Sequence, residues 1–289
     1  GEPLLSLTEE ELARGKKLAE GTYGIRNPFV LIFARESGYV NDEVKGKNRL
    51  LGNVLNSTLA SMDAYRNSSI DNYVSLIDAL AQRDVQAVRF GRNVGKSIRR
   101  NNLADYASDE PTDFMDFYLN SQCLFIIGDS SGALQIAPLY QRPTIYVNTM
   151  QVSVRNDSIP VINKERDLMI FHRYYDTKQK KYLSLKDMLQ IENEINAKTS
   201  DPSPWLLSKY YERNNIIPEK NTSMEILAVA DEMLDRIQGR AVYTEEDMDL
   251  QNRYERIVAE NYVKLPHSYL MQTRVGRDWL REHASWFLA

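Results

Sequence analysis

Cysteine and histidine are scarce in this sequence, and their scarcity excludes several kinds of chemistry. Cys123 is the only cysteine among 289 residues, so a framework of disulfides is excluded. Because Cys123 adjoins an apolar segment, we interpret it as a small buried hydrophobic residue rather than as a catalytic thiol. The three histidines, His172, His267 and His283, lie far apart, without a carboxylate or cysteine at ligand spacing. We therefore expect no metal site.

Long apolar runs and an excess of one charge are also missing. No segment approaches the roughly 18 apolar residues that cross a bilayer, and residues 1–12 (GEPLLSLTEEEL) lack the regions of a secretory signal. The 36 lysines and arginines nearly balance the 40 aspartates and glutamates, which gives a net charge of −4 and does not favour nucleic-acid binding. We expect a cytoplasmic protein without a transmembrane segment. Since the chain does not begin with methionine, we expect it to be part of a longer polypeptide.

What the sequence does contain is an alternation of apolar strand patterns and amphipathic helix patterns between residues 28 and 150. The motifs Thr8-x-x-Glu11, Ser68-x-x-Asp71 and, further along the chain, Thr222-x-x-Glu225 are typical of helix starts. Alternation of this kind predicts a Rossmann-like α/β domain with a parallel sheet and right-handed crossovers. The expected strands are 29–34, 85–90, 124–127 and 144–148, and the expected helices are about 8–20, 70–81, 111–122 and 132–140.

The pattern changes after residue 150, and we divide the chain accordingly. Residues 1–27 are expected to form a connector helix region, residues 28–150 the Rossmann-like domain, and residues 151–289 a loop and helical C-terminal extension that packs on the same domain. In the extension we expect a strand or extended segment at 169–175 and helices at about 184–197, 222–238, 245–263 and 276–287.

Residues 128–132, Gly-Asp-Ser-Ser-Gly, follow the third expected strand and match more than one functional pattern. The pattern G-x-S-x-G is the nucleophile elbow of serine hydrolases, with Ser130 as the nucleophile. A small-residue turn before a helix can instead bind phosphate through backbone and hydroxyl donors of Ser130 and Ser131, with Gly132 allowing close approach. A third interpretation is that a serine only caps the helix. The hydrolase is the weakest of these, because no histidine lies in a recognisable catalytic context.

Charged residues follow two further strands. Arg35 and Glu36 come directly after the first strand, and Arg89 and Gly91 end the second. Carboxyl ends of neighbouring parallel strands meet where open α/β folds bind ligands, and an arginine there can hold two phosphate oxygens. Alternatively, Arg35 and Glu36 pair with each other or with solvent. The agreement of the strand ends favours a site for a phosphorylated ligand.

Two loop segments border the same expected site. Tyr65, Arg66 and Asn67 precede a helix and could supply an aromatic face and a guanidinium, or form a solvated loop. Residues 91–97 (GRNVGKS) have three residues between the first glycine and Gly-Lys, whereas a P-loop needs four. We therefore reject an ATPase and keep this loop as a rim of the site.

Six segments, in their order and spacing, resemble a known family. They are FVLIFARESGYV (29–40), AYRNSSIDNY (64–73), AVRFG (87–91), DYASDEPTDFMDFYL (105–119), IIGDSSGALQIAPLYQRPTIYVN (126–148) and NTSMEILAVADEML (221–234). The family is one of bacterial glycosyltransferases expected to adopt the GT-B fold of two Rossmann-like domains. The resemblance covers most of residues 5 to 260.

The resemblance implies transfer of a sugar from a nucleotide-sugar donor to a glycan or glycolipid acceptor in polysaccharide biosynthesis. The chain would be the donor-binding half, completed by an N-terminal acceptor domain or a partner subunit. It would act in the cytoplasm or at the inner face of the membrane, with no permanently bound cofactor. The alternatives are a non-catalytic nucleotide or sugar-phosphate binding module, and a serine hydrolase.

In this interpretation Arg35 and Arg89 offset the charge of the diphosphate, which the 130–132 turn holds. Glu36 is the candidate catalytic base, although positioning of the ligand is an equal interpretation. The sequence departs from the family pattern in having Arg-Glu where Arg-Asp is expected and Gly-Asp-Ser-Ser-Gly in place of a Thr-Gly-Ser-Gly type of turn. Asp129 would repel a diphosphate unless it points away or contacts a ribose or sugar hydroxyl.

Overall fold

The structure, a computed structural model, describes residues 2–36, 67–92, 94–95, 97–150, 163–198, 204–261 and 274–289. Its residues form two compact units, Gly1–Ile145 and Tyr146–Ala289, called unit 1 and unit 2 below. The division falls within the strand β5 (Thr144–Thr149), close to residue 150, where the sequence pattern changes.

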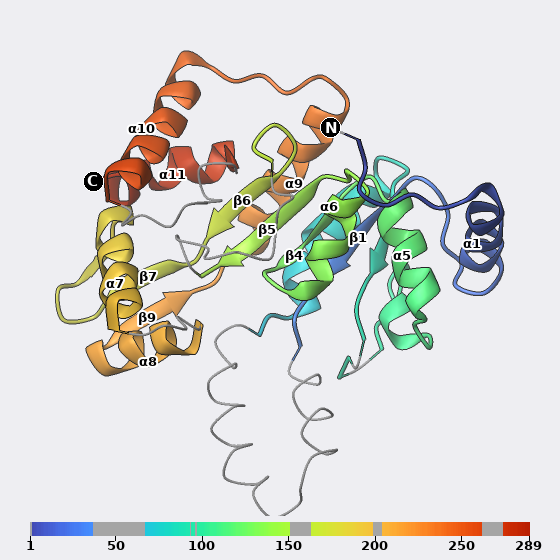
Figure 1. The fold of residues 1–289 in the computed structure, drawn as a ribbon, viewed down its shortest axis with the longest axis horizontal. Coiled ribbons are helices and arrows are strands. Elements are labelled where there is room, and N and C mark those ends of the chain that lie inside the picture. The colour runs from blue at the N-terminus through green and yellow to red at the C-terminus, as the bar shows by residue number, and fades with distance from the viewer. Residues whose placement is uncertain are drawn as a thin grey trace, which may run out of the picture. The chain divides into compact units, whose positions relative to one another are not determined.

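Unit 1 alternates strands and helices, as the sequence predicts (Figure 1). Its elements are α1 (Glu9–Gly21), β1 (Phe29–Phe33), the 3₁₀ turn η2 (Ile70–Tyr73), α4 (Val74–Ala81), β2 (Gln86–Arg89), β3 (Leu103–Ala104), η3 (Tyr106–Ser108), α5 (Asp113–Gln122), β4 (Ile126–Asp129), η4 (Gly132–Gln135) and α6 (Ile136–Leu139). Strand β1 pairs in parallel with β2 and with β4, and β2 pairs in parallel with β3.

The strand order makes the fold Rossmann-like. The seven-stranded sheet has the order β10-β6-β5-β4-β1-β2-β3. Read from β3, its first six strands run 3-2-1-4-5-6, which is the Rossmann order. The expected α/β class with a parallel, Rossmann-like sheet is confirmed. In such a sheet the order reverses between β1 and β4, and ligands bind outside the carboxyl ends of the strands at that point.

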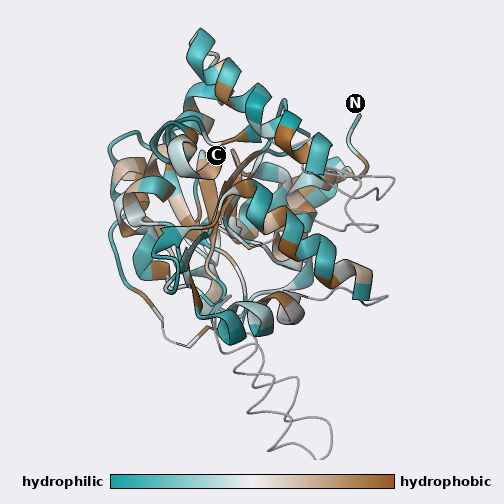
Figure 2. Ribbon diagram, turned by 90° about the vertical axis from the view of Figure 1, so that its left-hand side faces the viewer, coloured by the Kyte–Doolittle hydropathy of each residue, from teal (hydrophilic) through white to brown (hydrophobic). Residues whose placement is uncertain are grey.

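Apolar strands and close helix packing form the core of unit 1. Figure 2 colours the strands of the sheet as hydrophobic, and Val30, Leu31 and Ile32 of β1 are completely buried. A strand buried on both faces is typical of a parallel sheet. Helix α1 packs against α5 so closely that a Cβ atom on Gly15 would stand 2.0 Å from the Tyr118 ring.

Two predicted capping boxes are confirmed. At the start of α1 the Glu11 N–H donates to Thr8 Oγ1 at 3.2 Å, and the Thr8 N–H donates to Glu11 Oε2 at 2.7 Å. Thr222 and Glu225 form the same pair at the start of α9 (Ser223–Ile237). These local motifs need only neighbouring residues, which is why the sequence predicts them well.

Two other helix starts differ from the expectation. Ser69, rather than Ser68, caps the turn η2 by accepting a hydrogen bond from the Asp71 N–H, because the Ser68 hydroxyl donates to Asp129 instead. Helix α5 starts at Asp113 with Thr112 as its cap, two residues later than expected from Pro111. The long-range bond to Asp129 is invisible to a local motif.

Unit 2 contains more strands than the one strand or extended segment expected in the C-terminal extension. Its elements after β5 are β6 (Leu168–Phe171), β7 (Arg173–Asp176), β8 (Lys181–Tyr182), α7 (Leu185–Lys198), α8 (Pro204–Asn214), β9 (Ile216–Glu219), α9, α10 (Glu245–Asn261), β10 (Arg274–Val275) and α11 (Arg277–Phe287). Strand β10 pairs in parallel with β6, while β7 pairs antiparallel with β8 and β9 in a small second sheet. The segment expected at 169–175 is two strands that separate at His172.

Within the described ranges, the structure contains no helix whose length and apolar character would let it cross a bilayer.

Candidate functional site

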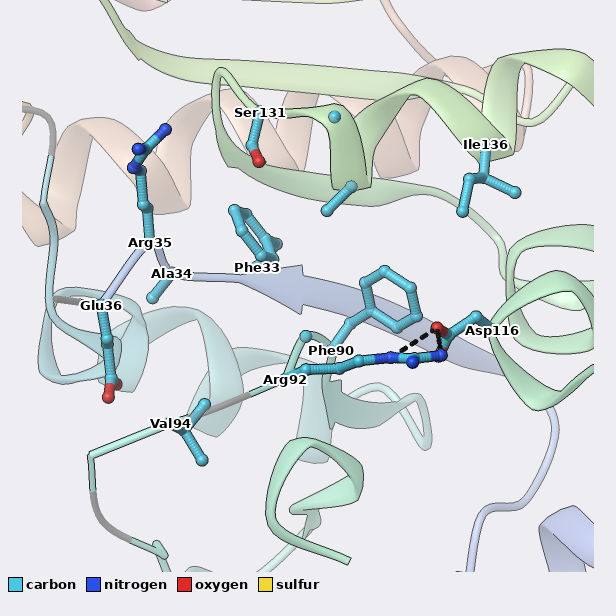
Figure 3. Close-up of a pocket in the computed structure, with 13 residues that line it drawn as sticks. Phe33, Ala34, Arg35, Glu36, Phe90, Arg92, Val94, Asp116, Ser131 and Ile136 are labelled. Carbon is cyan, nitrogen blue, oxygen red and sulfur yellow. Dashed lines mark hydrogen bonds and ion pairs between the residues drawn. The ribbon is translucent and has the colours of Figure 1, made fainter. Parts of the chain in front are cut away.

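A pocket of about 430 Å³ lies in unit 1 where β1, β2 and β4 end (Figure 3). Residues after β1 line one part of it, and residues after β4 line another. It therefore occupies the reversal point of the sheet, where Rossmann-like folds bind ligands. Its apolar wall includes Phe33, Phe90 and Ile136, and its polar lining includes Arg35, Glu36, Arg92, Asp116 and Ser131.

The structure brings Arg35, Ser131 and Gly132 together at this pocket, as the sequence predicts. Figure 3 shows the Arg35 guanidinium and the Ser131 hydroxyl on the same side of the pocket, with Glu36 directed to the other side. The Ser131 side chain makes no capping hydrogen bond to the following turn. A purely structural capping role therefore does not account for this hydroxyl.

Gly132 is exposed, and a Cβ atom built on it would find no heavy atom within 4 Å. The backbone beside Ser131 is thus open to close approach by a ligand. However, the expected helix starts here as the 3₁₀ turn η4, and only four residues of α6 follow. The dipole of so short a helix contributes little, so local N–H and O–H donors are the relevant groups.

Gly128 and Asp129 belong to β4, which extends two residues beyond the expected strand end. A Cβ atom on Gly128 would stand 2.3 Å from the carbonyl oxygen of Phe33, so glycine is needed for the close approach of β4 to β1. The first glycine of the G-x-S-x-G pattern thus has a packing explanation that requires no nucleophile elbow.

Asp129 does not line the pocket, so of the two arrangements considered for it the structure favours the one in which it points away. Its carboxylate is buried, with 3% of the residue exposed, and Oδ2 accepts hydrogen bonds from the Arg35 N–H at 3.1 Å and from the Ser68 hydroxyl. It therefore ties the end of β4 to the residues after β1 and before η2. Burial, and secondly the Asp129 charge, raise the pKa of Tyr73 well above its usual value.

Arg89 corrects the sequence interpretation most clearly. Only 1% of its side chain is exposed, and it does not line the pocket. Its Nη2 donates to Glu36 Oε1 at 2.7 Å, and its Nη1 donates to Asp105 Oδ1 at 3.1 Å. The guanidinium is thus engaged with two carboxylates, so the structure does not support a direct contact of Arg89 with phosphate.

Glu36 is held in the same network. While Oε1 accepts from Arg89, Oε2 accepts from the Gly95 N–H at 3.0 Å. Oε1 is therefore tied to the end of β2, and Oε2 to the β2–β3 loop, residues 90–102. This engagement disfavours Glu36 as a catalytic base and gives it a structural role that neither interpretation included.

The β2–β3 loop supplies pocket residues that sequence reasoning named only as a rim. Gly91, predicted as a site residue, lines the pocket with a φ of 132°, a conformation that favours glycine. Arg92 follows it, and its Nε donates to Asp116 Oδ2 at 3.1 Å. Asp116 comes from an ordinary amphipathic helix, so no sequence signal distinguished it.

Asp116 links the pocket lining to the buried residue Tyr106. Its Oδ1 accepts a hydrogen bond from the Tyr106 hydroxyl at 2.7 Å. Burial is the main cause that raises the pKa of Asp116, although hydrogen bonds from Tyr106 and Arg92 oppose it. Burial also raises the pKa of Tyr106, followed by the effect of Asp116.

The remaining predicted site residues lie elsewhere or outside the described part. Ser130 and Asn67 are half-buried and do not line the pocket. Tyr65 and Arg66 lie outside the described residues.

The histidines are informative about the hydrolase interpretation. Every histidine of the sequence belongs to unit 2, so unit 1 contains the serines of the G-x-S-x-G pattern without a histidine of its own. His172 is 1% exposed, and burial lowers its pKa to about 3, helped by Lys220 and Arg173. His283 is hydrogen-bonded to Glu225, with Nε2 and Oε1 2.8 Å apart.

His283, Glu282 and Glu225 do come together in unit 2, which the sequence spacing did not indicate. Glu225 is already engaged, however, because it accepts hydrogen bonds from Arg173 at 3.0 Å and from the Thr222 N–H at 2.6 Å. The guanidinium supplies the positive charge that a metal ion would otherwise bring. The Glu225–Arg173 ion pair therefore explains the buried part of this group, and Glu282 is exposed beside it.

Comparison with known proteins identifies no relative: no family model, no curated protein and no solved structure matches the chain.

Proposed function

We propose that this chain is a nucleotide-sugar-dependent glycosyltransferase, or its donor-binding half, and that the pocket of unit 1 holds the nucleotide diphosphate. The observation that carries the proposal is the meeting of Arg35, Ser131 and Gly132 at the β1/β4 reversal point of a Rossmann-like sheet. The resemblance to GT-B glycosyltransferases supports it from the sequence alone.

The chemistry of the pocket suits a departing diphosphate. When a sugar is transferred, negative charge develops on the diphosphate oxygen that leaves it. A guanidinium can bind two phosphate oxygens, and the Ser131 hydroxyl and the Gly132 N–H can donate to others. Donors fixed before the reaction stabilise this charge without having to reorganise. Phe33 and Phe90 line the pocket as apolar surface for the base or the sugar ring.

The acceptor, a glycan or glycolipid, would be held by an N-terminal domain or a partner subunit, in the cytoplasm or at the inner face of the membrane. This arrangement corresponds to the GT-B fold, of which the present chain would be the donor half.

A non-catalytic nucleotide or sugar-phosphate binding module is the second candidate. It is favoured by the engagement of the pocket carboxylates, since Glu36 is bonded to Arg89 and Asp116 to Arg92. Neither carboxylate is poised as a base in the described part of the chain.

A thermal-shift titration with nucleoside diphosphates tests the shared part of both proposals. We expect at least one of UDP, GDP, CDP, ADP and dTDP to raise the melting temperature of the wild-type chain. Arg35→Ala should abolish that rise. Arg256→Ala removes the same charge from an exposed position of α10 and should preserve it. No shift with any of the nucleotides would sink the donor-site proposal.

Release of nucleoside diphosphate from the corresponding nucleotide sugar separates the two candidates. A complete enzyme should release it as the sugar passes to water or to an added saccharide, whereas a binding module, or a donor-binding half on its own, should bind the nucleotide sugar without turnover. Labelling of Ser130 by a fluorophosphonate probe would instead revive the hydrolase.

A further inference from the structure

A second cavity of unit 1 runs along the β3 edge of the sheet. It has a volume of about 820 Å³ and shares no lining residue with the pocket described above. We call it the β3 groove. Tyr23 and Gln86 line one part, Ser97, Arg99 and Asn101 of the β2–β3 loop line another, and Asp105 and Asp109 follow β3. A cavity of this size accommodates a ligand of several rings.

Hydrogen bonds to Asp105 hold the lining of the β3 groove in place. Asp105 accepts hydrogen bonds from the buried Arg89, from the Ile98 N–H at 2.6 Å and from the Ser108 hydroxyl at 2.8 Å. The carboxylate thereby anchors the end of the β2–β3 loop that carries Ser97 and Arg99. The groove is a built feature whose walls are held by a buried ion pair.

The cation of the groove is Arg99. Its neighbour Arg100 is paired with Asp78, with Nη2 and Oδ2 2.7 Å apart. Arg99 is exposed, and no ion pair joins it to any residue in the described ranges. The nearby side chains of Ser97 and Asn101 are also exposed. A guanidinium beside uncharged hydrogen-bonding groups can bind a carboxylate and the hydroxyl groups around it.

The acidic lining residues of the groove select among anionic ligands. Asp105 and Asp109 would repel a uniformly charged chain such as nucleic acid. The oxygens of the exposed Asp109 can instead accept hydrogen bonds from ligand hydroxyl groups. The Tyr23 ring, held edge-to-face by Tyr106 at 5.0 Å, adds apolar surface of the kind that packs on a sugar ring.

A peptide fits the β3 groove less well. Strand β3 is only two residues long, so its edge offers few main-chain groups for pairing with an added strand. We propose that the β3 groove binds a short acidic saccharide, with the sugar carboxylate at Arg99 and the sugar hydroxyls at Ser97, Asn101 and Asp109. This site stands independently of the nucleotide pocket.

Isothermal titration of the full chain in about 150 mM salt tests the assignment. The probes are trigalacturonate and sialyllactose as acidic saccharides, maltotriose as a neutral saccharide, and a hexapeptide of aspartate and glutamate. We expect binding of at least one acidic saccharide, and Arg99→Ala should weaken it about tenfold or more, as for loss of a charge-assisted hydrogen bond. Arg256→Ala, which loses the same charge outside the groove, should bind as the wild type does.

The variants are compared at equal folding, which their melting temperatures report. The assignment is overturned if neither acidic saccharide binds, if Arg99→Ala and the wild type bind equally, or if maltotriose or the acidic peptide binds as tightly as the acidic saccharides. None of these probes is a nucleotide. If no saccharide binds, the proposed function of the pocket is therefore unaffected, and if no nucleotide binds, the assignment of the β3 groove is unaffected.

Discussion

Single residues near the pocket carry two kinds of role, contact with a ligand and support of the residues that make it. Arg35 and Ser131 line the pocket, whereas Arg89 lies behind it and holds Glu36 and Asp105. Through the Gly95 and Ile98 amides these carboxylates fix the β2–β3 loop, which borders both cavities. From the sequence alone, an arginine at a strand end looks the same in either role.

Arg89→Met should therefore destabilise unit 1 strongly. It leaves two carboxylates without the buried guanidinium, a loss that typically costs about 3–5 kcal/mol. Arg92→Met is the matched control, because Arg92 is 41% exposed and should lose below about 1 kcal/mol. Urea unfolding measures both, and equal losses would contradict the assignment of Arg89.

The two outer glycines of residues 128–132 should behave oppositely. Gly128→Ala places a methyl group against the Phe33 carbonyl and should cost about 1–3 kcal/mol of unfolding free energy. Gly132→Ala meets open space, so it should change stability by less than about 0.5 kcal/mol. If a ligand approaches this backbone, Gly132→Ala should still weaken nucleotide binding. Unaltered binding would argue against close approach there.

His172 should make stability depend on pH. Its folded pKa of about 3 lies below the ordinary value of 6.5, so below pH 6.5 the unfolded chain takes up a proton that the folded chain does not. Stability is therefore fully present above about pH 6.5 and falls as the pH drops toward 3. Between pH 7 and pH 5 the wild type should lose about 2 kcal/mol more than His172→Phe. Urea unfolding at both pH values measures this loss. An equal loss of unfolding free energy in the wild type and in His172→Phe would contradict the prediction.

At the scale of elements, the sequence predicts what depends on long or local patterns. The alternation in unit 1 and the capping boxes of α1 and α9 follow from such patterns. Strands β3, β8 and β10 have two residues each, too few to show a period, and their pairing depends on distant partners. The cap of η2 is Ser69 rather than the expected Ser68, because Ser68 bonds to Asp129, far away in the sequence.

The residues of the candidate site also divide into those that a sequence pattern predicts and those that depend on distant packing. Arg35, Gly91, Ser131 and Gly132 could be predicted because strand ends of a parallel sheet converge. Asp116 could not, because its place in the pocket depends on how α5 packs. Asp129 was placed correctly at a strand end, but its side chain turns to Ser68 and the Arg35 backbone, which only the structure reveals.

The cap of α9 gives a prediction for a whole element. Thr222→Ala removes the hydroxyl that accepts from the Glu225 N–H and should lower stability by about 1 kcal/mol. Thr222→Ser keeps this acceptor and should lose much less. Thermal or urea unfolding measures both, and equal losses would mean that packing of the threonine methyl group matters more than the cap.

At the scale of the whole molecule, unit 1 combines a Rossmann-like strand order with two separate cavities. A Rossmann-like strand order places a cavity at its reversal point, and that cavity carries a guanidinium, a hydroxyl and an open backbone. A second, more polar cavity lies along the β3 edge, and the β2–β3 loop borders both.

The central claim is that the pocket recognises diphosphate through Arg35. Isothermal titration of the nucleoside diphosphates and their parent nucleosides against the wild type and Arg35→Ala tests it most directly. For the nucleotide that binds, the wild type should prefer the diphosphate to the nucleoside by about tenfold or more, and Arg35→Ala should lose most of that preference. A preference that survives in Arg35→Ala, or no binding of any nucleoside diphosphate, would contradict the account.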